Sequence, residues 1–159
     1  MHIEIRKANA SHIPFLQDIA RGTISSLYRS FLEKKDVSAA IDAVAADFDL
    51  LENISEYDVL LIDAGLVGFS RCQADRIAFL MIADGFHRQG LGSRLLKHCE
   101  TQLFRRHPKI KIDSFEGNKK AHFFLLKNGW EEAGNSVDEK SGTNKRHFVK
   151  TKQDGSAGI

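Results

Sequence analysis

An apolar run that leads into a glycine-containing turn is the feature of this sequence that most restricts its fold. Residues 77–83 read Ile-Ala-Phe-Leu-Met-Ile-Ala, so both faces of a strand built from them are apolar. Such a strand must be covered on both sides, which favours a central place in a sheet between helices. Residues 86–93, Phe-His-Arg-Gln-Gly-Leu-Gly-Ser, then lead into a helical pattern. We therefore predict a strand, a tight turn and a helix N-terminus in direct succession.

The turn around Gly90 and Gly92 is typical of an anion-binding site. The N–H groups in the first turn of a helix have no partners within the helix, and glycines let a phosphate approach the backbone closely. A dinucleotide-binding fingerprint would need a third glycine where Leu95 stands, and a P-loop would need a lysine where Ser93 stands. These residues alone leave two readings open: a site for a phosphorylated cofactor, or a connection that binds nothing.

Size and composition predict one ordinary globular domain. The chain has 159 residues and a net charge of +2, which gives no argument for a nucleic-acid partner. We expect a single domain over residues 1–152 and a flexible C-terminal tail over 153–159. Cys72 and Cys99 have no metal or redox spacing, which predicts reduced thiols, no metal site and a cytoplasmic protein. The first residues alternate like a strand rather than a signal peptide, and no apolar run reaches the roughly 18 residues of a membrane span.

The rest of the chain mixes strand and helix patterns. Apolar runs and alternation predict strands at 3–5, 57–62, 66–71, 110–113, near 130 and at 146–151. Apolar spacings of three and four predict helices that begin near residues 11, 25, 38, 92 and 118, and Gly22 is expected to end the first of them. One strand-rich sheet with helices on both faces is the economical arrangement.

A second motif lies downstream of the glycine turn. Asn118 is followed by Ala121, Phe124 and the pair Gly129-Trp130. Together with the stretch His87-Arg88-Gln89-Gly90-Leu91-Gly92, this motif resembles the cofactor motifs of the GNAT superfamily of acetyl-CoA-dependent N-acetyltransferases, in their order and spacing. The resemblance runs over nearly the whole length. It implies an α/β (mixed α+β), three-layer fold with a central, mixed, mostly antiparallel twisted sheet of about six or seven strands.

The same resemblance implies acetyl-CoA as the cofactor and no metal. It assigns the pyrophosphate to the backbone amides of residues 87–92 and the pantetheine arm to the backbone of Ile82 and Ala83. The Ile82 N–H would then polarise the acetyl carbonyl. Lys119 and Lys120 have two readings, contact with the 3′-phosphate or ordinary exposed helix lysines. The expected cofactor-binding residues are Ile82, Ala83, His87, Arg88, Gln89, Gly90, Leu91, Gly92, Ser93, Asn118, Lys120 and Phe124.

Two positions depart from the family pattern. His87 stands where the family usually has Arg or Gln, which a site built mainly from backbone amides tolerates. Leu125 stands where many members carry a Tyr that protonates the departing thiolate. Because a thiol with a pKa near ~8.5 is already a fair leaving group, transfer does not strictly require that acid.

The amine acceptor needs a group that takes its proton, since a primary amine with a pKa near ~10.4 is mostly charged at neutral pH. Asp113 is the first candidate because it alternates with Ile110 and Ile112; its other reading is a paired or solvated carboxylate. Glu116 is the second, and its other reading is a favourable contact with a helix dipole. The expected catalytic residues are thus Ile82, Asp113 and Glu116.

These expectations combine into a functional hypothesis. The chain would move an acetyl group from acetyl-CoA to an amine by direct transfer in a ternary complex, with a small-molecule acceptor favoured over a protein. The resemblance places the acceptor pocket in the region of Tyr28, Arg29 and Glu33, and these residues have two readings: a substrate role, or ordinary packing and surface charge. An acyl-CoA-binding regulatory module with weak or no catalysis is the alternative, which Leu125 keeps open. Nucleic acid and membrane are not expected as partners, and a homodimer stays open.

Overall fold

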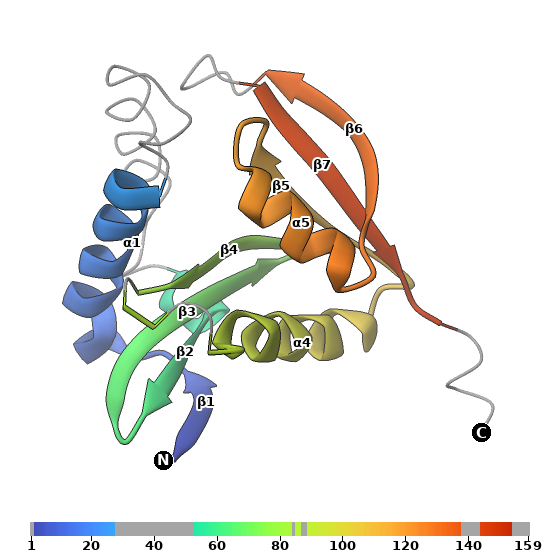
Figure 1. Cartoon of the computed structure of the whole chain (residues 1–159). Helices are drawn as coiled ribbons and strands as arrows, with labels where there is room; N and C mark the ends of the chain where they lie inside the picture. Colours follow the sequence, from blue (N-terminus) through green and yellow to red (C-terminus); the bar gives the residue numbers. More distant parts are fainter. Residues whose placement is uncertain (1, 28–52, 84, 87–88, 138–143, 154–159) are drawn as a thin grey trace.

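The computed structural model describes residues 2–27, 53–83, 85–86, 89–137 and 144–153. Within them, one sheet is flanked by helices (Figure 1). The expected helix beginning near residue 38 and the expected acceptor residues Tyr28, Arg29 and Glu33 lie outside this part. The elements are β1 (Ile3–Lys7), α1 (Ile13–Leu27), β2 (Tyr57–Ile62), β3 (Gly65–Gln73), β4 (Arg76–Ile82), α4 (Leu91–Phe104), β5 (Lys109–Phe115), α5 (Lys119–Lys127), β6 (Glu131–Val137) and β7 (Asn144–Thr151), with short 3-10 helices at Ala10–His12 and Ile54–Glu56.

The sheet has seven strands in the order β1-β2-β3-β4-β5-β7-β6. Neighbouring strands are antiparallel except β4 and β5, which are parallel. The parallel pair is joined by α4, as a crossover between parallel strands requires. The expected fold, a mixed and mostly antiparallel sheet between helices, is therefore confirmed.

Helices cover both faces of this sheet, and β4 contributes to the packing on each side. On one face, α1 packs Leu16 and Ile19 into a cluster with residues of β2 and β3 and with Met81 of β4. On the other face, α4 and α5 pack against the sheet, where Ile77 and Ile82 of β4 are buried. Both faces of the run 77–83 are thus covered, as its composition predicts.

Helix α1 corrects one prediction, because it does not end at Gly22 but continues to Leu27. Its buried face extends past the glycine: Thr23, which follows Ile19 and Ala20 by one helical turn, is 5% exposed. A glycine inside a helix costs only about 0.5–1 kcal/mol relative to alanine, so packing of this face against the sheet outweighs it. Within the described residues, no helix is long and apolar enough to cross a membrane.

Candidate active site

The parallel strands β4 and β5 stay together over a very short distance. Their register pairs only Arg76 with Lys111 and Ile77 with Ile112. Beyond these pairs β4 continues to Ile82 and β5 to Phe115, with no further pairing described between these two strands. The sheet is therefore interrupted at the C-terminal end of β4, directly before the glycine-containing turn.

Ile82 is held at this interruption by a close contact with β3. The Ala83 N–H donates to the Val67 carbonyl at 2.8 Å, which makes Gly68 and Ile82 a non-hydrogen-bonded pair. The Ile82 N–H therefore points away from β3, toward the side of β5. A Cβ atom on Gly68 would lie 2.7 Å from the Ile82 Cδ1 atom and 2.9 Å from the Met81 carbonyl oxygen. Only glycine at position 68 allows the two strands to approach this closely. The role expected for the Ile82 N–H, contact with the acetyl carbonyl, stays a prediction.

The turn that connects β4 to α4 contains two glycines with positive φ angles. Gly85 has a φ of +90° and Gly90 a φ of +74°, values that favour glycine. Gly90 is the N-cap of α4 and provides no side-chain capping bond. The first intrahelical bond runs from the Arg94 N–H to the Gly90 carbonyl, so the N–H groups of residues 91–93 have no partner within the helix. They form the donor set that an anion needs.

The space around this turn fits a phosphate group. A Cβ atom on Gly90 would meet no described residue within 4 Å, and Gly90 itself is exposed. Gln89 and Ser93 are also exposed, whereas Leu91 is buried and anchors the first turn of α4. The surface around Gly90 is thus exposed, while Leu91 holds the first turn of the helix against the core. These observations fit the phosphates of coenzyme A, which supplies an activated acetyl thioester when it carries an acetyl group.

The two sequence motifs meet in space. A Cβ atom on Gly92 would lie 3.5 Å from the Phe124 Cζ atom, an ordinary van der Waals contact. Phe124 is half-buried and packs against the core cluster of α4 and α5. It therefore backs the first turn of α4 with an aromatic ring, and whether it also contacts a cofactor stays a prediction.

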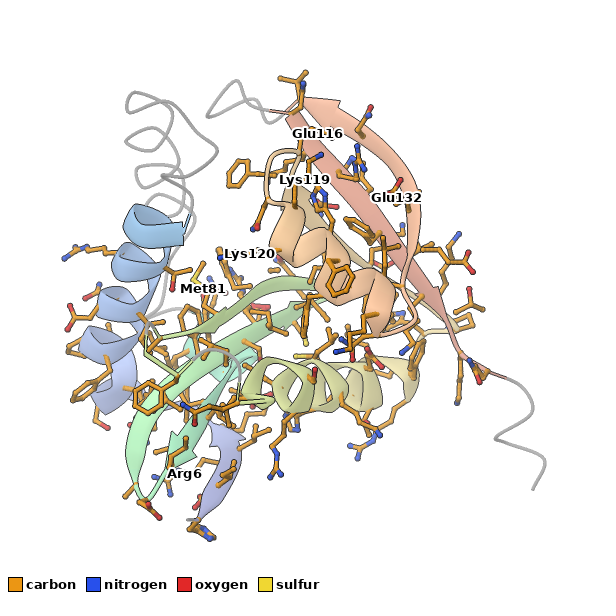
Figure 2. All side chains as sticks on the ribbon, viewed as in Figure 1. Arg6, Met81, Glu116, Lys119, Lys120 and Glu132 are labelled. Carbon is orange, nitrogen blue, oxygen red and sulfur yellow. The ribbon has the colours of Figure 1, made fainter. Side chains whose placement is uncertain are left out.

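Asn118 has a structural role at the start of α5. Its side-chain oxygen accepts a hydrogen bond from the Ala121 N–H at 3.3 Å, which makes it the N-cap of α5, as the sequence predicts. Lys119 and Lys120 follow in the first turn and are exposed at the beginning of α5 (Figure 2). Their exposure is compatible with both readings of these lysines.

Glu116 lies just before this cap and is held by β7. The Arg146 guanidinium donates to Glu116 and, at 2.8 Å, to Glu132 of β6, which Figure 2 also labels. The hydrogen bond from Arg146 lowers the pKa of Glu116, and this outweighs the opposing effect of desolvation. A carboxylate with a lowered pKa that already pairs with a guanidinium is a weak proton acceptor.

Asp113 lies on β5, one residue past the point where β4 and β5 part. Its Oδ1 atom is 2.6 Å from the His147 Nδ1 atom, and its Oδ2 atom accepts a hydrogen bond from Arg76. Burial raises the pKa of Asp113, but the His147 hydrogen bond and the Arg76 charge more than offset it, so the pKa is lowered. Of its two readings, the structure gives Asp113 the contacts of a paired carboxylate; its catalytic role stays a prediction.

The side chain of Leu125 does not reach this region. It is 3% exposed and packs in the cluster that also holds Trp130 and Phe148. The position where many family members carry a tyrosine is thus part of the hydrocarbon core. His87 and Arg88 lie outside the described residues, so the structure neither places them at the turn nor removes them from it.

One group of polar residues escaped the sequence analysis. His147 lies beside Asp113, and its Nε2 atom is 2.8 Å from the Ser136 Oγ atom. These residues come from three strands, so a one-dimensional pattern held no signal for them; a known register between β5 and β7 would have revealed the Asp113–His147 pair. In the described part of the chain, no group of three His, Cys, Asp or Glu side chains is arranged to hold a metal ion.

Comparisons with known proteins agree with this geometry. The family model of the acetyltransferase (GNAT) domain matches residues 30–150. The GCN5-related N-acetyltransferase of Rhodopseudomonas palustris is 15% identical, with a TM-score of 0.85 over 96% of this chain and 97% of that one. The PaiA N-acetyltransferase of Thermoplasma acidophilum, solved in complex with coenzyme A, is 19% identical, with a TM-score of 0.79 over 96% of this chain and 100% of that one.

A longer enzyme contains the same fold as one part. The N-acetylglutamate synthase of Neisseria gonorrhoeae, solved with coenzyme A and N-acetyl-glutamate, is 20% identical with a TM-score of 0.68. The alignment covers 95% of this chain and 35% of that one. At these identities the solved structures establish the fold, and the family model covers most of the sequence. The chain belongs to the GNAT acetyltransferase family.

Proposed function

We propose that this protein is an acetyl-CoA-dependent N-acetyltransferase that acts on a small amine in a ternary complex. The observation that carries the proposal is the first turn of α4, whose N–H groups at residues 91–93 have no partner within the helix and which follows the end of β4, where β4 no longer pairs with β5. The backing of that turn by Phe124 supports it, since Gly92 and Phe124 belong to the two separate motifs and lie 32 residues apart in the sequence. Membership of the family and the coenzyme A complex of the PaiA relative point the same way.

Residues 91–93 would hold the pyrophosphate through backbone N–H groups, with the positive end of the α4 dipole behind them. Ile82 and Ala83 would line the pantetheine arm at the end of β4. Much of the rate enhancement would then come from positioning, because holding the thioester and the amine together converts a bimolecular reaction into a unimolecular one. Lys120 would contact a further phosphate group, which its exposure at the start of α5 supports.

Direct transfer is favoured over an enzyme-bound intermediate at a cysteine. Cys99 is fully buried in α4. Its hydrogen bond with Cys72 and, to a lesser extent, its burial raise the pKa of the Cys99 thiol. A buried thiol with a raised pKa is a poor nucleophile. Cys72 and Cys99 are both free thiols, which supports our proposal of a cytoplasmic location.

An acyl-CoA-binding module without turnover is the second candidate. It is favoured by the burial of Leu125 in the core and by the engagement of both Asp113 and Glu116 in ion pairs. In that protein, the α4 turn would bind acyl-CoA and the rest of the site would carry no proton acceptor.

One pair of measurements separates these candidates. Isothermal titration calorimetry measures the binding of coenzyme A and acetyl-CoA, and a thiol-release assay with acetyl-CoA measures turnover on polyamines, amino acids, aminoglycosides and lysine peptides. We expect binding with turnover on at least one small amine. Binding without turnover on any acceptor would favour the regulatory module, and the absence of binding would contradict both candidates.

A further inference from the structure

Three side chains from β5, β7 and β6 form a hydrogen-bonded line outside the cofactor turn. The Asp113 Oδ1 atom lies 2.6 Å from the His147 Nδ1 atom. The His147 Nε2 atom lies 2.8 Å from the Ser136 Oγ atom. An acid, an imidazole and a hydroxyl are thus joined through the two ring nitrogens in the order found in Ser-His-Asp nucleophiles, which are recognised by geometry rather than by sequence position.

The strand register explains how these residues come together. Ile112 pairs with Phe148, and both belong to the core cluster under α4 and α5. The next pair, Asp113 and His147, therefore points to the opposite face of the sheet. A bulge between Glu132 and Gly134 shifts β6, and Ser136 then lies diagonally across from His147 on that same face. On this face, the described core contacts of α1 are with β2, β3 and β4. Asp113, His147 and Ser136 lie on the other part of the sheet, formed by β5, β7 and β6.

The charge state of Asp113 sets the roles of the two ring nitrogens. Its other oxygen accepts from Arg76, and its pKa is lowered despite burial, so it is a carboxylate at neutral pH. A carboxylate can only accept hydrogen bonds, so the His147 Nδ1 atom carries the proton between them. With the proton of a neutral imidazole held at Nδ1, the Nε2 atom presents a lone pair that can accept the hydroxyl proton of Ser136. This arrangement prepares the hydroxyl to lose its proton.

The hydroxyl is also accessible. Ser136 is exposed, while His147 keeps 34% of its side chain exposed and Asp113 only 16%. Gly134 stands directly across from His147, and a Cβ atom on it would meet none of the described residues within 4 Å. Among the described residues, the exposed Ser136 hydroxyl and the empty position beside Gly134 give a small acyl group access to the Ser136 Oγ atom, while Asp113 is the most buried of the three groups.

We propose that Ser136 is a nucleophile that accepts acyl groups from activated carboxylic esters, with His147 as its general base and Asp113 as the residue that orients His147. The Ser136 Oγ atom bonds to the ester carbonyl carbon, and its proton passes to the His147 Nε2 atom. The carbon–oxygen bond to the leaving alcohol breaks, and that alcohol takes the proton from His147. Water then repeats the sequence on the acyl-serine and releases the carboxylic acid, so ester and water become acid and alcohol. This reactivity is separate from acetyl transfer at the α4 turn.

The test uses two reagents in separate assays: a fluorophosphonate probe that labels activated serines, and p-nitrophenyl acetate, whose hydrolysis is followed. Intact-mass and peptide mass spectrometry locate each adduct. We expect one adduct, on the peptide that contains Ser136, and ester hydrolysis above the buffer rate. The variant Ser136→Ala should abolish the adduct, because it removes the nucleophilic oxygen. His147→Gln should lower the labelling rate by roughly 100-fold, the lower end of what a positioned base contributes. Asp113→Asn should slow labelling by about 10-fold or more while Ser136 stays the labelled residue, since the hydroxyl and the imidazole remain.

Two controls make the result specific. Thr151→Ala removes an exposed hydroxyl from the same face of β7, four residues from His147, and should change nothing. Ser93→Glu at the α4 turn should leave labelling and ester hydrolysis unchanged, so failure of the cofactor site and failure of Ser136 can be told apart. Labelling of Ser136 at equal rates in wild type and His147→Gln, or labelling spread over several serines, would overturn the proposal.

Discussion

The substitution Ser93→Glu separates the cofactor site from the stability of the helix that forms it. Residue 93 is the third residue of α4 after the N-cap Gly90, and its side chain is exposed. A carboxylate there meets the positive end of the helix dipole, which contributes about 0.3–1 kcal/mol. For a domain of this size that corresponds to a Tm increase of about 1–4 °C. The variant should therefore be at least as stable as the wild type.

The same carboxylate should weaken coenzyme A binding, because it competes with the pyrophosphate for the N–H groups of residues 91–93. Two unit charges about 6 Å apart repel by about 0.7–2.8 kcal/mol when the effective dielectric constant is between ~80 and ~20. This predicts a Kd for coenzyme A that is about 3- to 100-fold higher. Added salt should reduce the difference in Kd between Ser93→Glu and the wild type, since ions screen exposed charges.

Calorimetry for the Kd and differential scanning calorimetry for the Tm measure both effects on the same protein. Ser93→Gln is the matched control, because glutamine has nearly the size of glutamate but no charge. Without the charge repulsion, this variant should bind coenzyme A within about threefold of the wild type. A Ser93→Glu protein with raised Tm and unchanged affinity would refute the assignment of the pyrophosphate to this turn. A lowered Tm would contradict the position of the helix N-terminus itself.

Three further predictions concern the framework around the site. Gly68→Ala should lower the free energy of unfolding by about 1–3 kcal/mol, because its Cβ meets the Ile82 side chain and a backbone carbonyl at under 3 Å; unchanged urea denaturation would contradict the close approach. The His98–Asp58 pair, 3.1 Å apart, raises the pKa of His98 above its ordinary value of 6.5, so its contribution is complete below that pH and is lost as pH rises through the folded pKa. His98→Gln should therefore lower Tm more at pH 5.5 than at pH 8.5, and an equal loss at both would refute the ion pair. Leu125→Tyr should destabilise by about 1–3 kcal/mol without raising turnover, because the side chain fills a closed core; a faster, equally stable enzyme would show that the position opens to the thiolate.

The parts of this structure that local chemistry determines were predictable from the sequence. The run 77–83 had to be a strand covered on both faces, because both of its faces are apolar, and β4 contributes to the core on each side of the sheet. Asn118 could be recognised as a helix cap because the cap bond spans only three residues. The resemblance to the GNAT family led from these local features to the complete fold.

The parts that depend on register were not predictable. Whether Asp113 is a free base or a paired carboxylate depends on β7, 34 residues later, and on the position of Arg76 at the start of β4. A bulge in β6 then decides which residue of that strand meets His147, and the sequence of Ala133 and Gly134 carries no clear sign of it. Gly22 was misread for a related reason, since burial of the α1 face, a property of the tertiary fold, overrides its local tendency to end a helix.

The brief pairing of β4 with β5 has a mechanical consequence. Strands β1–β4, within residues 3–82, form one contiguous half of the sheet, and β5–β7, within residues 109–151, form the other. In the described residues, backbone pairing between β4 and β5 is limited to two residue pairs, and the Arg76–Asp113 ion pair and the core cluster under α4 and α5 also link the halves. Because the first turn of α4 is also the proposed cofactor contact, we expect a bound cofactor to stabilise the packing between the two halves. We expect hydrogen exchange in β5–β7 to slow on coenzyme A binding even at amides far from the ligand.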